Sequence, residues 1–302
     1  MSDTDGLRLL HVHAHPDDES SKGAATTAYY VSQGVEVLVA TCTGGERGSI
    51  LNPKMDTPEN WACLPELRRD EMLRAAAILG IDQVWLGYVD SGLPESPEED
   101  LPPEAFARLD PDVAAGPLVK VIRDFRPQVL TTYDEHGGYP HPDHIQCHRV
   151  SMAAVAAAAD PDAWPEHGAP WQVAKVYYDM SLHRARYAAL DAAMHEAGMG
   201  RPYADWLTEW VEDTERHSRL TTFVPCSSFF EVRNAALLAH ATQIDPDGNW
   251  FAVPLAIQQA GWPTEDYQLV KSAVPVSLPE SDLFAGLRTP SEDNLQTWFY
   301  SI

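Results

Sequence analysis

Short apolar runs alternate with longer amphipathic stretches through the first half of the chain. The apolar runs have the length of strands buried in a sheet, and the stretches between them have the apolar spacing of helices. We expect strands at residues 7–12, 35–41, 83–86 and 128–132, and helices at 23–33, 65–79 and 113–125. Gly34 and Gly80 fit the ends of the first two helices, and Ser20 and Ser21 are candidate caps at the start of the first.

This alternation predicts an α/β fold, in which a mainly parallel sheet is flanked by helices on both faces. Residues 1–172 would form its core. From residue 173 the pattern changes to one further strand, expected within 173–180, and then to helical stretches rich in Trp, Tyr and Phe. We expect residues 173–302 to form a C-terminal lobe that completes the same single domain, closes over the site and lines the substrate pocket.

Composition narrows the class of protein. The 302 residues carry 21 Lys and Arg against 45 Asp and Glu, a formal net charge of −24. Nucleic acids and anionic membranes are bound through clustered Lys and Arg, so neither is an expected partner. There is no apolar run of about 18 residues, as a membrane span requires, and the first residues lack the basic start of a secretory signal. The four scattered cysteines are typical of reduced thiols, which favours a cytoplasmic enzyme of undetermined oligomeric state with a small-molecule substrate.

Two polar segments follow expected strands and carry candidate metal ligands. They read HAHPDDE from residue 13 and YPHPDH from residue 139, and ligands of such sheets bind at the carboxyl ends of the strands. A catalytic zinc has three ligands from His, Asp or Glu and keeps a position for water. His15 and Asp18 are three residues apart across a proline, and His144 supplies a third ligand from the second segment. This set would leave a bound ion a Lewis acid that lowers the pKa of water.

The neighbours of these ligands are candidate catalytic residues. Asp17 lies beside a ligand without being needed as one, and it is the candidate general base. His141 is the candidate acid, or the donor to a developing oxyanion, and Tyr139 is a second candidate donor. Asp143 could orient His141 or His144.

Other interpretations of these residues stay open. A single His-Pro-Asp can be a capped turn, but two copies at strand ends favour a metal site. A nucleotide-binding module of the same general fold would need a Gly-x-Gly-x-x-Gly turn after the first strand, which the sequence lacks. Cysteine catalysis would need Cys147 or Cys42 beside a base, whereas a buried thiol is the more ordinary interpretation of Cys147.

The motifs resemble those of the LmbE/PIG-L-like zinc-dependent deacetylases. The stretches that carry the likeness are HAHPDDESSKGAAT (13–26), TGGERGSILNP (43–53), RRDEM (68–72), WLGYVDSGLP (85–94), TTYDEHGGYPHPDHIQCH (131–148), AHATQIDP (239–246) and LFAGL (283–287). They span nearly the whole chain. The resemblance implies a Rossmann-like fold and one Zn²⁺ per chain, with Fe²⁺ possible because two His and one Asp suit both metals.

The resemblance also implies a reaction. It is strongest to the branch of the family that acts on mycothiol S-conjugates, cleaving the amide between an S-substituted cysteine and glucosaminyl-inositol. The products would be a mercapturic acid and glucosaminyl-inositol. Arg68 and Asp90 match positions that would hold sugar or inositol hydroxyls, and Lys22 could reach the cysteinyl part. The alternative for Lys22 is a solvated lysine in the first turn of a helix.

Two alternatives remain inside the family. The chain could be a deacetylase of N-acetylglucosaminyl-inositol in mycothiol biosynthesis, or an amidase for a biosynthetic thiol conjugate. Lys22 and the GGERG segment argue against simple deacetylation. Ser49 stands where the family has glutamate, and His136 stands where it has asparagine; neither position belongs to the expected metal set.

Overall fold

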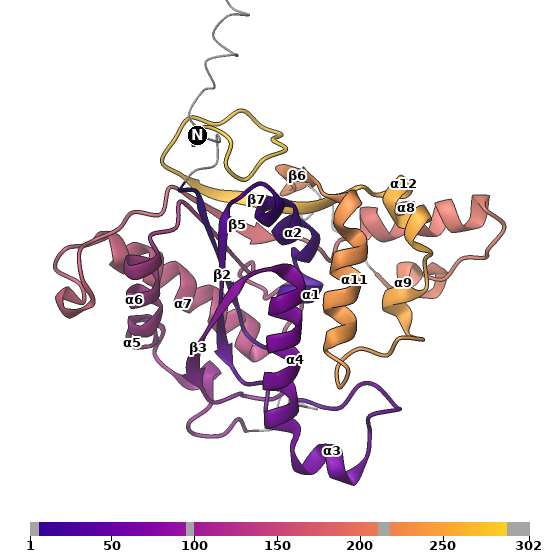
Figure 1. Cartoon of the computed structure of the whole chain (residues 1–302), viewed down its shortest axis with the longest axis horizontal. Coiled ribbons are helices and arrows are strands. Elements are labelled where there is room, and N and C mark those ends of the chain that lie inside the picture. Colours follow the sequence, from indigo (N-terminus) through magenta and orange to yellow (C-terminus); the bar gives the residue numbers. More distant parts are fainter. Residues whose placement is uncertain (1–5, 95–99, 211–217, 289–302) are drawn as a thin grey trace, which may run out of the picture.

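The computed structural model describes residues 6–94, 100–210 and 218–288, and its centre is one mixed β-sheet (Figure 1). Among these residues the sheet has seven strands in the order β3-β2-β1-β4-β5-β7-β6. The strands are β1 (Arg8–His13), β2 (Glu36–Thr43), β3 (Asp82–Tyr88), β4 (Val129–Thr132), β5 (Lys175–Asp179), β6 (Thr222–Pro225) and β7 (Thr264–Ser272). The five strands β1 to β5 pair in parallel, while β7 runs antiparallel to both β5 and β6. The expected mainly parallel α/β sheet is confirmed.

Helices cover both faces of this sheet. They are α1 (Asp18–Ser21), α2 (Ala24–Ser32), α3 (Pro58–Ala62), α4 (Leu64–Leu79), α5 (Pro111–Ala114), α6 (Gly116–Phe125), α7 (Pro142–Ala159), α8 (Arg184–Glu196), α9 (Ala204–Glu209), α11 (Phe230–Ala239) and α12 (Leu255–Gly261). On one face α6 and α7 pack, and on the other lie α2 and α11, with α4 beside them (Figure 1). None of the helices in the described ranges is long and apolar enough to cross a membrane.

Adjacent side chains of a strand belong to different halves of the core. Leu10 and Leu130 pack with α6 and α7, whereas Leu9 and Val129, their neighbours in the chain, pack with α2 and α11. The central strands are therefore apolar on both faces, because successive side chains point to opposite sides of the sheet. This burial explains why they read as continuous apolar runs.

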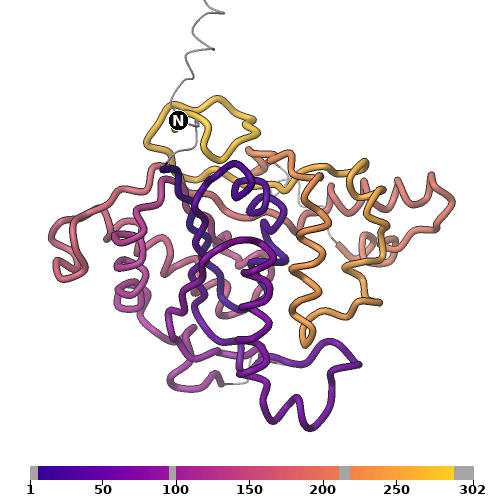
Figure 2. The backbone as a smooth tube through the Cα atoms, in the orientation of Figure 1, coloured from indigo at the N-terminus to yellow at the C-terminus, as the bar shows by residue number. Residues whose placement is uncertain are grey.

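The second half of the chain does not form a separate body. β5 pairs directly with β4, so the sheet continues across residue 172, the expected end of the core. In Figure 2 the orange segment of α11 lies beside the indigo and purple segments of α2 and α4, and α11 contacts both of these helices. The division into a core at residues 1–172 and a lobe at residues 173–302 remains a prediction, and one continuous sheet joins the two segments.

Two local predictions were wrong. The helix expected at 113–125 is split into α5 and α6 at Ala115. Pro117 causes the break, because it has no N–H to donate and its ring clashes with the carbonyl four residues back. Ser20 and Ser21 do not cap α2; they lie in α1, and α2 starts from Gly23 at φ 83°. A Cβ at Gly23 would lie 2.7 Å from the Tyr267 hydroxyl, so only glycine fits this turn.

Candidate active site

The loops after β1, β2 and β4 meet at the carboxyl edge of the sheet. The loop after β1 carries His15, Asp17 and Asp18, and the start of α7, which follows β4, carries His141 and His144. Ring contacts link the two segments: the His15 ring lies 4.6 Å from that of His141 and 5.3 Å from that of His144, between centroids. The structure therefore brings together the two segments that the sequence singles out.

One of the expected metal ligands, Asp18, lies close to the other two, His15 and His144. Asp18 Oδ2 is 3.5 Å from His15 Nδ1 and 3.6 Å from His144 Nε2. Two ligand atoms of a tetrahedral zinc, each bonded at about 2.0–2.2 Å, are separated by about 3.3–3.6 Å. Asp18 therefore sits between the two imidazoles at ligand spacing.

Each of the two histidines has one ring nitrogen held by a neighbouring oxygen and the other turned toward Asp18. His144 Nδ1 lies 2.9 Å from the carbonyl of Gly137, which accepts only if Nδ1 carries the proton. Nε2 then presents its lone pair, and it is buried without a hydrogen-bond partner among the described residues. His15 is held in the opposite sense, with Nε2 3.2 Å from Asp143 Oδ2 and Nδ1 facing Asp18. Metal-ligating histidines have this arrangement, so the donor set fits a divalent metal.

Asp18 is held as a carboxylate by its surroundings. The hydroxyl of Tyr133 donates to Oδ2 at 2.5 Å, the His15 amide donates to the same oxygen at 2.9 Å, and Lys22 Nζ lies 2.5 Å from Oδ1. Burial opposes this charge, but the Lys22 ammonium outweighs it and holds the pKa of Asp18 well below its ordinary value. Burial lowers the pKa of His144, so this imidazole is neutral at pH 7. Lys22 is only 11% exposed along its side chain, so its interpretation as a solvated lysine is wrong.

Other side chains near His15 could also serve as ligands. Two groups of three have ligand atoms within 4.8 Å of one another: His15 with His141 and His144, and His15 with Asp90 and Asp143. His15 belongs to both, and the first shares two members with the expected set. The expected set of His15, Asp18 and His144 stays a prediction, supported by the spacing around Asp18 and by the free nitrogen of His144.

Asp17 is held in a strained conformation beside a cation. Its φ of 118° is rare for any residue but glycine, and such strain is concentrated at functional sites. Its side chain is 24% exposed, and Oδ2 lies 3.4 Å from Arg68 Nη2. Burial raises the pKa of Asp17, while the guanidinium of Arg68 opposes that rise. A carboxylate with a raised pKa and partial access is suited to accept a proton.

Arg68 fixes this corner of the site from α4. Its guanidinium donates to the carbonyl of Gly45 at 2.7 Å and to that of Pro16 at 2.6 Å, so it ties the loops after β1 and β2 together. A Cβ on Gly45 would lie 2.2 Å from Arg68 Nη1, which explains the glycine at this position, with φ 63°. The arginine of RRDEM thus contacts the backbone and Asp17, and a role in holding sugar hydroxyls remains a prediction.

His141 has the tautomer of a hydrogen-bond donor. It caps α7, and its Nδ1 accepts from the Asp143 amide at 3.1 Å. The proton of the neutral ring therefore sits on Nε2. Burial and the neighbouring His15 lower the pKa of His141 to about 4, so the ring is neutral near pH 7. Tyr139 lies at the rim, 42% exposed, with its ring 4.7 Å from that of His144.

Asp143 and Asp90 support His15 from behind. Asp143 was expected to orient His141 or His144, but its carboxylate instead contacts His15 and accepts from the amide and hydroxyl of Ser91. Asp90 Oδ1 lies 3.5 Å from His15 Nε2, and its oxygens accept from the amides of Arg47 and Gly92. Asp90 is buried and offers little surface to a substrate. Its contact with substrate hydroxyls therefore remains a prediction.

Three contributors to the site were missed by sequence reasoning. Tyr133 holds Asp18 and stacks on His144 at 4.4 Å between ring centroids. Glu19, the last residue of HAHPDDE, is buried, pairs with His240 Nε2 at 2.6 Å and accepts from the Asp17 amide. Sequence reasoning could have found Tyr133 and His240 only because they lie within TTYDEH and AHATQIDP, two of the stretches that carry the family resemblance.

The remaining candidates lie away from the chemistry. Cys147 and Cys42 are buried with their sulfurs 3.7 Å apart, and burial raises the pKa of the Cys42 thiol well above its ordinary value. A raised pKa disfavours the thiolate that nucleophilic catalysis requires.

Ser49 and His136, the two departures from the family pattern, are both exposed.

Comparison with known proteins assigns the chain to a family. Residues 10–155 match PIG-L, described as GlcNAc-PI de-N-acetylase. Mycothiol S-conjugate amidase of Streptomyces coelicolor is 59% identical over 94% of this chain and 99% of its own length. A 1D-myo-inositol 2-acetamido-2-deoxy-alpha-D-glucopyranoside deacetylase of Catenulispora acidiphila is 43% identical over 95% of this chain and 91% of its own.

A solved structure shares the fold. N,N'-diacetylchitobiose deacetylase of Pyrococcus horikoshii has a TM-score of 0.59 at 19% identity, covering 87% of this chain and 83% of its own. The PIG-L match includes all the side chains that surround Asp18, and the relative from Streptomyces coelicolor extends the likeness across both parts of the sheet. On these grounds the chain belongs to the PIG-L family of de-N-acetylases.

Proposed function

We propose that this protein hydrolyses the amide between an S-substituted cysteine and glucosaminyl-inositol in mycothiol S-conjugates, releasing a mercapturic acid. The observation that carries the proposal is 59% identity, over 94% of the chain, to a relative named for this activity. The site supports the reaction class, because Asp18 between two correctly oriented imidazoles fits a metal hydrolase. The substrate is a small molecule, and the free cysteines are consistent with work in the cytoplasm.

The predicted roles of the side chains follow from their geometry. A zinc or ferrous ion held by His15, Asp18 and His144 would supply Lewis-acid chemistry at the amide. Asp17, with its raised pKa, accepts a proton from the attacking water, and Arg68 holds its carboxylate in place. His141, whose neutral ring carries its proton on Nε2, donates a hydrogen bond from that nitrogen to the oxygen that gains charge, and the proton that Asp17 takes from water passes to the leaving amine.

The substrate-binding assignments rest on position. Lys22 is the one nearest to the expected ligands, since its ammonium contacts Asp18 and lies 5.6 Å from the centre of the Tyr133 ring. We propose that it faces the cysteinyl side of the scissile bond. Arg68 and Asp90 border the same loops and would face the sugar, with Tyr139 at the rim as a second donor.

The second candidate is deacetylation of N-acetylglucosaminyl-inositol. The relative from Catenulispora acidiphila, 43% identical, is named for a deacetylase activity. A cavity of about 450 Å³ opens beside Ser21, next to Lys22, and it is far larger than an acetyl methyl requires. This space favours the amidase, whose acyl group is an S-substituted cysteine.

A competition experiment tests the proposal. Zinc-loaded protein would receive equal amounts of a mycothiol S-conjugate and N-acetylglucosaminyl-inositol, with products followed by mass spectrometry. Early and dominant release of the N-acetylcysteine conjugate is expected, whereas dominant acetate release would overturn the proposal in favour of the deacetylase. The variant His144→Ala should lose both turnover and stoichiometric metal; retained metal would show that the ligand set is wrong.

The native metal is a separate question with its own measurement. We propose zinc, one ion per chain, with ferrous iron as the alternative that the same ligands suit. Metal analysis of protein purified without added metal, and anaerobically, separates the two. Iron as the dominant metal in the anaerobic preparation would overturn the zinc assignment without changing the ligand set.

A further inference from the structure

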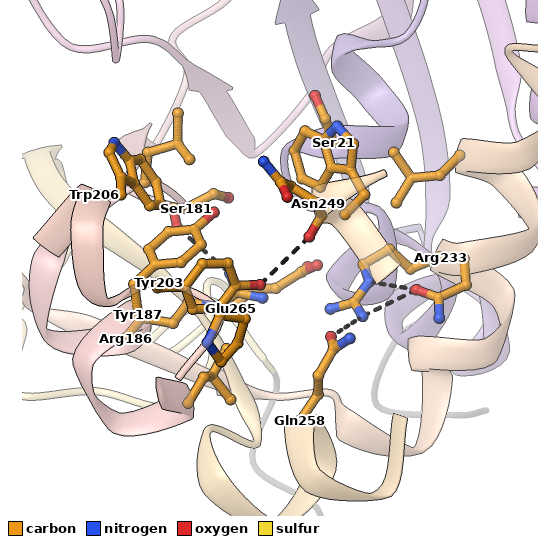
Figure 3. A pocket seen from close by; sticks show the side chains of 16 residues that line it. Ser21, Ser181, Arg186, Tyr187, Tyr203, Trp206, Arg233, Asn249, Gln258 and Glu265 are labelled. Carbon is orange, nitrogen blue, oxygen red and sulfur yellow. Dashed lines mark hydrogen bonds between the residues drawn. The ribbon is translucent and has the colours of Figure 1, made fainter. Parts of the chain in front are cut away.

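A large cavity lies in the second half of the chain, among α8, α9, α11 and α12 (Figure 3). Its volume of about 450 Å³ falls within the range of about 300–1,000 Å³ typical of small-molecule sites. Tyr187, Tyr203 and Trp206 line one side, and Arg233 with Gln258 lines the opposite side. The Tyr187 ring packs edge-on against Trp206 at 4.6 Å and against Tyr203 at 5.1 Å, between centroids, so the three rings form a packed aromatic wall.

Two arginines in this lining have no carboxylate partner within the described part of the chain. Arg233 is 6% exposed, and among the residues that the structure describes it donates only to neutral oxygens, those of Asn234 and Gln258. Its Nη1 is buried and has no partner among the described residues. The guanidinium of Arg186, on α8, makes a single long hydrogen bond to the described residues, 3.5 Å to the carbonyl of Ser181.

The charge of these arginines is not cancelled inside the cavity. Burial and the nearby Arg186 lower the pKa of Arg233 to about 10, so it stays cationic at pH 7. Glu265 is the acidic residue of the described lining, and its oxygens accept from the amides of Ala25 and Thr26 at the start of α2. Two guanidinium groups thus face one carboxylate that is already hydrogen-bonded, in a protein with a net charge of −24.

The cavity adjoins the candidate active site through Ser21. This residue lines the cavity, and its hydroxyl accepts from Lys22 Nζ at 3.2 Å. The same ammonium contacts Asp18, a predicted metal ligand. An acyl group that leaves the scissile bond on the Lys22 side therefore has the cavity directly beside it.

We propose that this cavity binds the S-substituent of the conjugate and selects substituents that carry an anionic group on an aromatic ring. The inference rests on the proposed function and adds its specificity. The aromatic wall of Tyr187, Tyr203 and Trp206 packs against the ring, and Arg186 and Arg233 bind a carboxylate or sulfonate. Arg233 Nη1 supplies a buried donor that no described protein group uses, and leaving such a donor unpaired is costly.

The test compares two matched mycothiol S-conjugates. One carries a 4-carboxybenzyl group on sulfur and the other a 4-methylbenzyl group, so that size is similar and charge differs. We expect kcat/KM to favour the acidic conjugate by about 10-fold or more, the size of one charge-assisted contact. Arg186→Gln should lower this acidic-to-neutral ratio by about 10-fold, since it removes one of the two cations.

Arg233 needs a more conservative variant, because its guanidinium lies 4.1 Å from the centre of the Phe230 ring and its removal threatens folding. Arg233→Lys keeps the charge but loses the planar fork, and it should lower the ratio less than Arg186→Gln does. Arg74→Gln, at an exposed position of α4, is the matched control and should leave the ratio unchanged.

A binding measurement gives a second readout. Titration of the mercapturic acids that the two conjugates release, followed by tryptophan fluorescence, should show tighter binding of the dicarboxylic product, and Arg186→Gln should remove the difference. Turnover of both conjugates with equal kcat/KM, or an unchanged ratio in Arg186→Gln, would overturn the inference and leave the amidase standing. Absence of turnover for both conjugates, with deacetylation intact, would overturn the proposed function and this inference together.

Discussion

Replacing Asp143 tests whether the site is organised to hold a metal. Its carboxylate is fully buried, lies 3.2 Å from His15 Nε2 and accepts from the amide and hydroxyl of Ser91. Asp143→Ala removes the acceptor that keeps His15 Nδ1 turned toward Asp18. Loss of such an outer partner lowers metal affinity by about 10- to 100-fold, or about 1.4–2.7 kcal/mol.

The surroundings of His15 narrow this range. Asp90 Oδ1 lies 3.5 Å from the same nitrogen and can replace the lost acceptor in part, so we expect the lower half of the range, about 10- to 30-fold. Asp143→Asn keeps an oxygen for His15 and Ser91 but removes the charge, and its loss should be smaller still. Asp143→Ala also leaves the Ser91 amide unpaired, which should cost about 1–3 kcal/mol in the free energy of unfolding.

Chelator competition measures the effect directly. Apoprotein would be titrated with zinc against a chromophoric chelator of known affinity, at a temperature where each variant is folded by circular dichroism. Asp70→Asn, an exposed position on α4, is the matched control and should bind zinc like the wild type. If Asp143→Ala bound zinc with wild-type affinity while folded, the reasoning that His15 is a ligand oriented by Asp143 would be refuted.

Three further changes test other parts of the molecule. Asp17→Asn should keep zinc and lose about 100-fold or more in kcat, as removal of a general base does, whereas loss of metal together with activity would make Asp17 a ligand. Cys147→Ala should retain turnover, measured at saturating substrate, and abolished turnover with zinc still bound would restore the thiol as a nucleophile. Burial and the charge of Glu265 raise the pKa of Asp179 to about 6, although hydrogen bonds from Ser181 oppose that rise. Ionisation of Asp179 therefore destabilises the folded state as pH climbs from about 4 to 6. Asp179→Asn should therefore gain up to about 3 kcal/mol relative to wild type between pH 4 and pH 7 in urea unfolding, and a difference that does not change with pH would contradict this account.

The parts of the fold that the sequence predicts are those set by local burial. Residues 7–12 and 128–132 read as strands because both faces of the sheet are covered, and β1 and β4 lie within a residue of those bounds. The antiparallel pair β6 and β7 was not predicted. Its pairing depends on contacts with β5, which lies more than 40 residues earlier in the chain, and no local pattern encodes a partner that distant.

The site also combines residues marked by a local motif with contacts between residues far apart in the sequence. His15, Asp17 and Asp18 adjoin one another in sequence, and a proline-bounded motif marks them. Glu19 and His240 are 221 residues apart, so their pairing exists only in the folded chain. Asp143 illustrates the intermediate case, because the motif marks the residue but its partner, His15, lies on the other segment.

One sheet joins two sets of residues with separate tasks. The predicted hydrolytic groups stand on the loop after β1 and at the start of α7, whereas half of the residues that line the cavity come from α8, α9, α11 and α12. Substitutions on those helices can reshape the space for an acyl group without moving a hydrolytic side chain. Relatives that share the hydrolytic residues could thus differ in substrate preference through changes on these helices alone. A protein engineer can vary the same helices in a library to direct the enzyme toward a chosen conjugate.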